Sequence, residues 1–360
     1  MSVPLVLGLD FGGTKIAAAV ADLKGRRLAE ETILTNPARG ARWNLEAGLE
    51  VASTLLDQAG DEGELVAVGA STFGIPIAGG VLLAVAIPGW GELDLRRAIE
   101  SGLRCDVVRL ITDVKAAAAA EARSGALVGA DPAIYLNLGT GLAVGIVCGG
   151  RVIAGANGAA GEIGYCLRTR GDLERDPADR VLLEQAVSGM ALSAVAERET
   201  GLDLSAADVF AAESGDEALA SALDEFIDEL SFHLVNLSVA LNPERIAVGG
   251  GIVRSWARIE PKIARALETS VPFPPELVRG AFPYDAPLVG AIALGLEAHD
   301  LVGCGAVGRR EPHLGGLADG DGIRRARALG SKGPVCEVED VRASATQNPQ
   351  HRNGRKTKTD

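Results

Sequence analysis

The sequence contains few cysteines, and their spacing excludes two kinds of cysteine-based scaffold. The five are Cys105, Cys148, Cys166, Cys304 and Cys336, and no two of them form a C-x-x-C pair. Disulfide-built domains need paired cysteines, and zinc clusters need ligands at short, repeated spacings. We therefore expect free thiols in a reducing compartment, with neither a disulfide framework nor a zinc cluster.

The sequence also lacks an excess of positive charge. Its formal net charge is −13 over 360 residues, and the acidic excess lies outside the last 60 residues, which carry 11 Lys or Arg against 7 Asp or Glu. Nucleic-acid-binding domains normally present a basic surface. We therefore expect a small-molecule partner and no nucleic acid.

The sequence predicts no membrane-spanning helix in its longest charge-free stretches. Residues 74–90 are free of charge, but Pro76, Gly79, Gly80 and Pro88 interrupt them, which predicts buried strands and turns. The first motif, at Asp10, comes too early for a signal peptide to precede it. We expect a cytoplasmic protein without a membrane partner.

What the sequence does contain is a glycine-rich turn between two apolar runs. Residues 3–9 are apolar and end at Asp10, a Gly-Gly-Thr-Lys turn follows at 12–15, and a second apolar run covers 16–21. Glycines let the backbone N–H groups of such a turn approach a bulky anion. The turn leads into a strand, which excludes the dinucleotide fingerprint and the Walker loop, since both lead into a helix. This motif alone leaves both a phosphate site and an ordinary hairpin open.

The same pattern begins again at residue 133. An apolar run at 133–138 leads into a Gly-Thr-Gly turn at 139–141, and another run covers 142–148. In the first copy, three strands in hairpins are followed by a helix at 41–60 and a returning strand at 65–72, which predicts an antiparallel start feeding a parallel sheet. We expect two related lobes with backbone-lined anion pockets facing each other across a cleft.

A second carboxylate, Asp113, follows the predicted strand 107–111 and precedes an alanine-rich helix at 114–123. A carboxylate in this place can be a general base or only a helix cap. Beyond it the sequence predicts helices at 181–187, 190–200, 206–212 and 216–241, a strand at 245–248, a glycine turn at 249–251 and a last helix at 288–299. From residue 301 the periodicity ends, and we expect a disordered tail at 301–360.

Taken together, the motifs resemble those of the ROK family of sugar kinases and related repressors. In chain order they are Asp10-Phe11-Gly12-Gly13-Thr14-Lys15, Ile87-Pro88-Gly89-Trp90, Asp113, Leu138-Gly139-Thr140-Gly141, Ala160-Gly161-Glu162-Ile163-Gly164, Leu183-Glu184 and Gly249-Gly250-Gly251. The resemblance implies an α/β, two-lobed actin-like or hexokinase-like (ribonuclease H-like) ATPase fold with a duplicated βββαβα core. It places the N-terminal lobe at 1–113 plus 283–300 and the C-terminal lobe at 114–282.

The resemblance also implies roles for individual residues. The ATP phosphates would be held by Gly12, Gly13, Thr14, Lys15, Gly139, Thr140 and Gly141, and the adenosine would lie along Gly249, Gly250 and Gly251. Asp10 would lie near Mg²⁺ through water, and Asp113 would be the catalytic base for the substrate hydroxyl. Substrate would be bound by Thr112, Asp113, Glu162, Tyr165 and Glu184. Two alternatives without a functional role stay open: Glu162 can be a solvated charge in a loop, and Glu184 a surface residue of a helix.

Departures from the family pattern fall in the sugar pocket. Thr112 stands where the family usually has Asn, Tyr165 replaces the His of a Glu-x-Gly-His motif, and Ile77 replaces a Gly. The expected cysteine cluster is reduced to Cys166, so one thiol without a partnering His cannot hold zinc. In the family, the missing His and Glu184 belong to the anomeric end of the sugar and Asp113 to the end with the primary hydroxyl. The resemblance therefore implies retained catalysis and altered recognition of the far end.

We expect an ATP- and Mg²⁺-dependent kinase for the primary hydroxyl of a hexose or a hexose-like polyol. The acceptor is a glucose-type sugar or a C7-cyclitol, which keeps a hydroxymethyl arm but lacks an anomeric centre; N-acetylmannosamine and fructose are alternatives. A repressor would need a DNA-binding module ahead of Asp10, where nine residues stand. An inactive sugar sensor is the remaining hypothesis, and retention of Lys15 and Asp113 disfavours it. Family members are often dimers, so the resemblance also suggests a homodimer.

Overall fold

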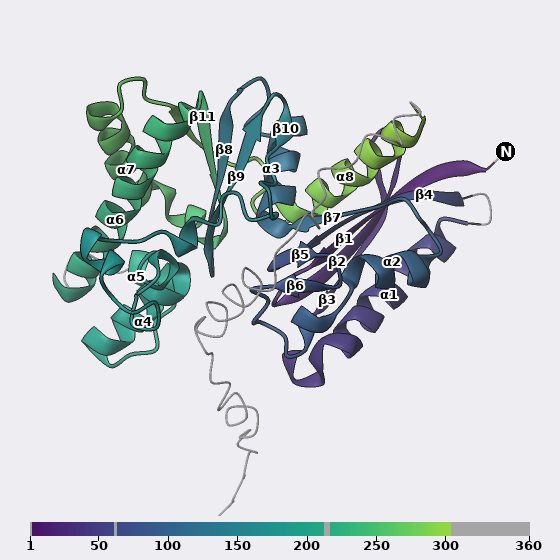
Figure 1. The fold of residues 1–360 in the computed structure, drawn as a ribbon, viewed down its shortest axis with the longest axis horizontal. Helices are drawn as coiled ribbons and strands as arrows, with labels where there is room; N and C mark the ends of the chain where they lie inside the picture. Colours follow the sequence, from purple (N-terminus) through teal and green to yellow (C-terminus); the bar gives the residue numbers. More distant parts are fainter. Residues whose placement is uncertain (1, 61–62, 212–216, 304–360) are drawn as a thin grey trace, which may run out of the picture.

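The protein is described by a computed structural model over residues 2–60, 63–211 and 217–303. Two five-stranded sheets lie side by side, and helices α3 (Asp113–Ser124) and α8 (Ala286–Gly303) pack between them (Figure 1). The predicted disordered tail at 301–360 is wrong for residues 301–303, which continue α8, and the rest of it lies outside the described residues. No described helix is long and apolar enough to span a membrane.

The first sheet has the strand order β3-β2-β1-β4-β7. Its strands are β1 (Val3–Phe11), β2 (Lys15–Asp22), β3 (Arg27–Leu34), β4 (Gly63–Thr72) and β7 (Val108–Thr112). β1, β2 and β3 pair antiparallel, whereas β4 and β7 join β1 in parallel, as the order of elements predicted. β1 continues to Phe11, so Asp10 lies within the strand and not beyond its end.

The remaining elements of the first lobe cover this sheet. They are α1 (Gly40–Gln58), α2 (Leu95–Leu103) and the two-stranded hairpin β5 (Ile75–Ile77) with β6 (Gly80–Leu82). The charge-free stretch therefore forms buried strands and turns, as expected from its prolines and glycines. Leu5, Leu7 and Leu9 point to the face covered by α1 and α2, and Val6 points to the α8 face, because successive residues of a strand alternate in direction.

The second sheet repeats the first, with the order β10-β9-β8-β11-β12. Its strands are β8 (Ala133–Leu138), β9 (Leu142–Cys148), β10 (Arg151–Val152), β11 (Arg245–Gly249) and β12 (Glu276–Arg279). Three antiparallel strands again feed two parallel ones, which confirms the predicted duplication. The sequence analysis did not predict β10 or β12, which are two and four residues long and carry no clear apolar alternation.

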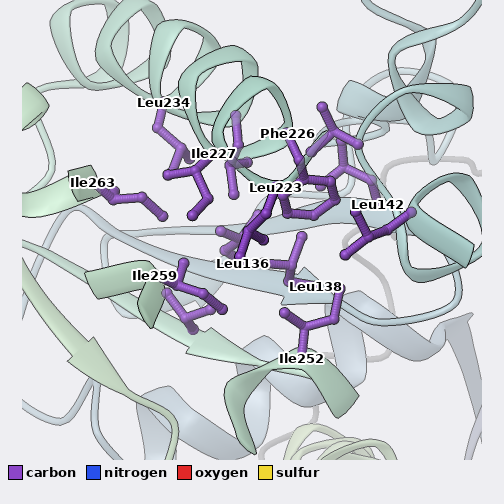
Figure 2. Packing of buried hydrophobic residues seen from close by; sticks show 14 of the residues in the cluster. Leu136, Leu138, Leu142, Leu223, Phe226, Ile227, Leu234, Ile252, Ile259 and Ile263 are labelled. Atoms are coloured by element: carbon purple, nitrogen blue, oxygen red, sulfur yellow. The ribbon is translucent and has the colours of Figure 1, made fainter. Parts of the chain in front are cut away.

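Helices on the outer face of the second sheet form the largest core. They are α4 (Gly189–Thr200), α5 (Ala206–Ala211), α6 (Glu217–Leu241) and α7 (Trp256–Ser270). Figure 2 shows Leu136 and Leu138 of β8 beneath α6, where Leu223 and Phe226 pack against them. The predicted helix at 181–187 is wrong: only a 3₁₀ turn at Leu183–Gln185 forms, and α4 starts afresh where the hydroxyl of Ser188 accepts the N–H of Ala191.

The two lobes meet at a close crossing of α3 and α8. A Cβ atom at Gly290 of α8 would lie 1.8 Å from the carbonyl oxygen of Ala116 in α3. No side chain fits in that space, so the two helix backbones are in direct contact. The first turn of α3, which begins at Asp113, is therefore held against α8.

Candidate active site

Asp113 lies where β7 ends and α3 begins. The hydroxyl of Thr112 accepts the N–H of Lys115 at 3.4 Å, so Thr112 is the N-cap residue of α3 and Asp113 is its first residue. One Asp113 oxygen accepts the N–H of Val114 at 2.8 Å. Desolvation, and then the charge of Asp10, raises the pKa of Asp113 to about 7, against a lowering effect of Lys115. Thr112 is thus the N-cap, and Asp113, which accepts one N–H of the first turn, keeps its second carboxylate oxygen for another purpose.

Asp10 lies in the first sheet and faces the same space. Its side chain is 5% exposed, and the hydroxyl of Ser71 in β4 donates to Oδ1 at 2.8 Å. Burial raises the pKa of Asp10 to about 6, opposed by the hydrogen bond from Ser71 and the charge of Lys15. Because the charge of Asp10 raises the pKa of Asp113, these two carboxylates belong to one site.

The Gly-Gly-Thr-Lys turn closes on itself between β1 and β2. The N–H of Gly12 donates to the carbonyl of Lys15 at 2.9 Å, and the side chain of Thr14 is exposed at the tip. The ammonium of Lys15 donates to the carbonyl of Tyr284 at 2.9 Å, in the segment that connects β12 to α8. Lys15 therefore lies against the connection between the lobes.

The two glycine turns of the second lobe lie against each other. Gly250 has φ of 89°, and a Cβ there would lie 2.4 Å from the carbonyl oxygen of Leu138. A Cβ on Gly139 would be 3.8 Å from the nitrogen of Gly251. Beside them opens a cavity of about 940 Å³, within the range of small-ligand sites. Gly139, Thr140, Ser188, Gly251 and Arg254 are among the residues that line it.

Glu162 is not a solvated loop charge in the structure. Its Oε1 lies 3.1 Å from the ammonium of Lys115, and its charge also raises the pKa of Asp113. Lys115 was not predicted from the sequence as a residue of the site. The signal available was a lone lysine, two residues after Asp113, in a helix otherwise made of alanine and valine near that end.

Glu184 and Tyr165 lie on the second-lobe side of the site. Glu184 Oε2 accepts the N–H of Leu142 at 2.8 Å, and burial raises the pKa of this carboxyl. Burial, with the charges of Glu184 and Glu162, raises the pKa of Tyr165 to about 12. Glu184 is thus half-buried on a short turn, not exposed on a helix, and the Glu162, Tyr165 and Glu184 side chains form one group.

Among the residues at 2–60, 63–211 and 217–303, no cluster of three or more His, Cys, Asp or Glu side chains could hold a metal ion. Any divalent ion near Asp10 would therefore take most of its ligands from other oxygens, as Mg²⁺ does when it binds phosphates and water.

Paired lobes of identical strand order, with carboxylates between them and glycine turns at the sheet ends, are the arrangement of the two-lobed hexokinase-like ATPase fold. The ROK family model matches residues 6–298. The chain therefore belongs to the ROK family, and the sugar kinases among its relatives identify it as a phosphotransferase with an alcohol group as acceptor.

Individual relatives support this assignment. The chain is 30% identical over 275 residues to a glucokinase of Halalkalibacterium halodurans, which covers 71% of the chain and 82% of the relative. It is 28% identical to a kanosamine kinase of Amycolatopsis mediterranei, over 82% of the chain and 97% of the relative. A ROK family glucokinase from Streptomyces griseus, solved in complex with glucose and AMPPNP, superposes with a TM-score of 0.66 at 27% identity, over 81% of this chain and 99% of that one.

Proposed function

We propose that the protein is an ATP-dependent sugar kinase that phosphorylates the primary hydroxyl of a hexose or of a hexose-like cyclitol, with Asp113 as the catalytic base. The observation that carries the proposal is the half-buried carboxylate of Asp113, which has one oxygen not bound to the helix N-terminus and is electrostatically coupled to Asp10 and Glu162. A carboxylate whose pKa lies near 7 accepts a proton readily at neutral pH. We also propose the lobe boundaries 1–113 plus 283–300 and 114–282, which the division of the strands into two sheets supports.

The base would act on the attacking hydroxyl of the acceptor. Asp113 orients that hydroxyl by accepting its O–H, and it takes the proton as the oxygen attacks the γ-phosphoryl group. The Glu162 and Glu184 carboxylates accept from ring hydroxyls, and Thr112 and Tyr165 complete the pocket wall. Closure of the lobes would exclude water, which otherwise competes as the phosphoryl acceptor.

The nucleotide would lie along the glycine turns. Gly12, Gly13, Thr14 and Lys15 from the first lobe and Gly139, Thr140 and Gly141 from the second would hold the phosphates, with Gly249, Gly250 and Gly251 beside the adenosine. The cavity next to Gly139 and Gly251 supports this placement. Mg²⁺, when bound, would neutralise phosphate charge, and the buried Asp10 carboxylate fits a role in holding it through water.

A substrate panel tests the choice of acceptor. Steady-state phosphorylation of glucose, mannose, N-acetylmannosamine, fructose and C7-cyclitols is compared by kcat/KM at saturating ATP. We expect at least one cyclitol or other hexose to reach a kcat/KM equal to or above that of glucose, because Tyr165 replaces the family's His at the anomeric side. If glucose far exceeds all of them, the argument from the altered pocket is wrong; no ATP consumption with any acceptor would favour the inactive sensor.

The rate should depend on pH through Asp113. The base must be ionised to accept a proton, and its pKa is raised to about 7. The kcat/KM for the acceptor should therefore rise with pH, about tenfold per unit below 7, and level off above it. The profile is measured at saturating ATP, so that nucleotide binding does not shape it. A flat profile between pH 5.5 and 8 would contradict the raised pKa of Asp113, whose role as the base is tested by Asp113→Asn.

A further inference from the structure

Lys115 is a buried cation beside the proposed acceptor site. Its side chain is 2% exposed and is among the largest fully buried side chains of the described residues, surrounded along α3 by alanines. Lysine is almost never fully buried unless it is paired, because removing an ammonium from water is costly. The position therefore calls for a specific partner.

That partner connects two parts of the site. The ammonium of Lys115 lies 3.1 Å from Oε1 of Glu162 and 3.5 Å from the hydroxyl of Thr112. Thr112 directly precedes the proposed base, and Glu162 belongs to the loop after β10. One side chain thus links the start of the base-bearing helix to a carboxylate proposed to bind the acceptor.

The backbone of Glu162 is fixed independently of Lys115. Gly161 has φ of 84°, and a Cβ there would lie 1.9 Å from the carbonyl oxygen of Val144. The N–H of Val144 in β9 also donates to the carbonyl of Gly161 at 2.8 Å. With its backbone held on β9, Glu162 depends on Lys115 for the direction of its side chain, which is still 22% exposed.

We propose that Lys115 is a positioning residue for acceptor recognition: it holds Oε1 of Glu162 and leaves Oε2 to receive one hydroxyl of the acceptor at a fixed place. This inference rests on the proposed function. Because the ammonium orients Oε1 toward α3, Glu162 presents Oε2 to the acceptor and is placed for one hydroxyl and not for a vicinal pair. Lys115 itself does not touch the acceptor.

Lys115→Met tests the proposal, since it keeps the length of the side chain and removes the charge. We expect the KM for the best acceptor to rise about tenfold or more, the kcat to fall less than about threefold, and the KM for ATP to stay within twofold. Lys262→Met is the matched control, because it removes the exposed ion pair between Lys262 and Asp224 on α7 and α6 and should leave all three constants unchanged.

A double-mutant cycle gives the decisive readout. Glu162→Gln alone should also raise the acceptor KM, and Lys115→Met added to it should cause less than a twofold further change, since the residue it positions is already altered. If the increases in acceptor KM caused by Lys115→Met and Glu162→Gln multiply in the double variant, the proposal is overturned. An unchanged acceptor KM in Lys115→Met would also overturn it. If Lys115→Met does not fold, Lys115→Gln enters the same cycle. Wild-type turnover with the acceptor decides the proposed function separately.

Discussion

Asp113→Asn should lower kcat by about 10³-fold, while the KM for the acceptor changes less than about threefold. The amide keeps the shape of the side chain and its hydrogen bond from Val114, but it cannot accept a proton, and a positioned base contributes roughly 10²–10⁴-fold to such reactions. Loss in kcat without loss in binding is the signature of an interaction needed only in the transition state. Steady-state kinetics on the best acceptor measure both constants.

The control for this variant is Asp224→Asn, which removes an exposed carboxylate on α6. Its kinetic constants should equal those of the wild type. Circular dichroism should give the same spectrum for both variants and the wild type. Undiminished turnover in Asp113→Asn would overturn the assignment of the base, and with it the mechanism of phosphoryl transfer proposed for this chain.

Gly290→Ala should reduce the free energy of unfolding by about 3 kcal/mol. The new methyl group would lie 1.8 Å from a backbone oxygen of α3, so the two helices must separate, and overpacking of this kind costs roughly 1–3 kcal/mol and occasionally more. Denaturant unfolding followed by circular dichroism measures the change. Activity should fall too, because Asp113 belongs to the displaced helix.

Gly60→Ala is the control for Gly290→Ala, because it adds a methyl group at a positive φ without a steric clash. Gly60 has φ of 89° with nothing within 4 Å of its virtual Cβ, so alanine there meets only conformational strain, worth about 1–2 kcal/mol. Gly290 is helical, and its cost comes from contact alone. If Gly290→Ala proves no more destabilising than Gly60→Ala, the helix crossing is looser than the structure indicates.

The order of elements could be predicted because neighbouring strands and helices follow one another along the chain and each has a local sequence pattern. Apolar runs, glycine turns and the helix at 41–60 determine the antiparallel start and the parallel return, and the second copy repeats them. The family resemblance added the lobes and the candidate residues. The helix expected at 181–187 failed because Leu183 is buried from a short turn, which is a tertiary effect, and because the local cap at Ser188 starts α4 separately.

Contacts between distant residues could not be predicted from the sequence. From the sequence, Thr112 was expected as a substituted Asn in the substrate pocket, whereas the structure also makes it the N-cap of α3, a local role. Lys115 and Glu162 are 47 residues apart, and nothing in local periodicity brings them together. Lys15 was expected at the phosphates, and its contact with the Tyr284 carbonyl depends on where the chain returns from the second lobe.

The backbone contact between Gly290 and Ala116 also determines how the halves of the molecule can move. We expect the two lobes to rotate about this contact, because it is a point of direct approach between the backbones of α3 and α8. Asp113 is three residues, or about 4.5 Å along the helix axis, from this pivot. Such a rotation would move the Asp113 carboxylate least. It would move the strand ends farthest from the contact the most.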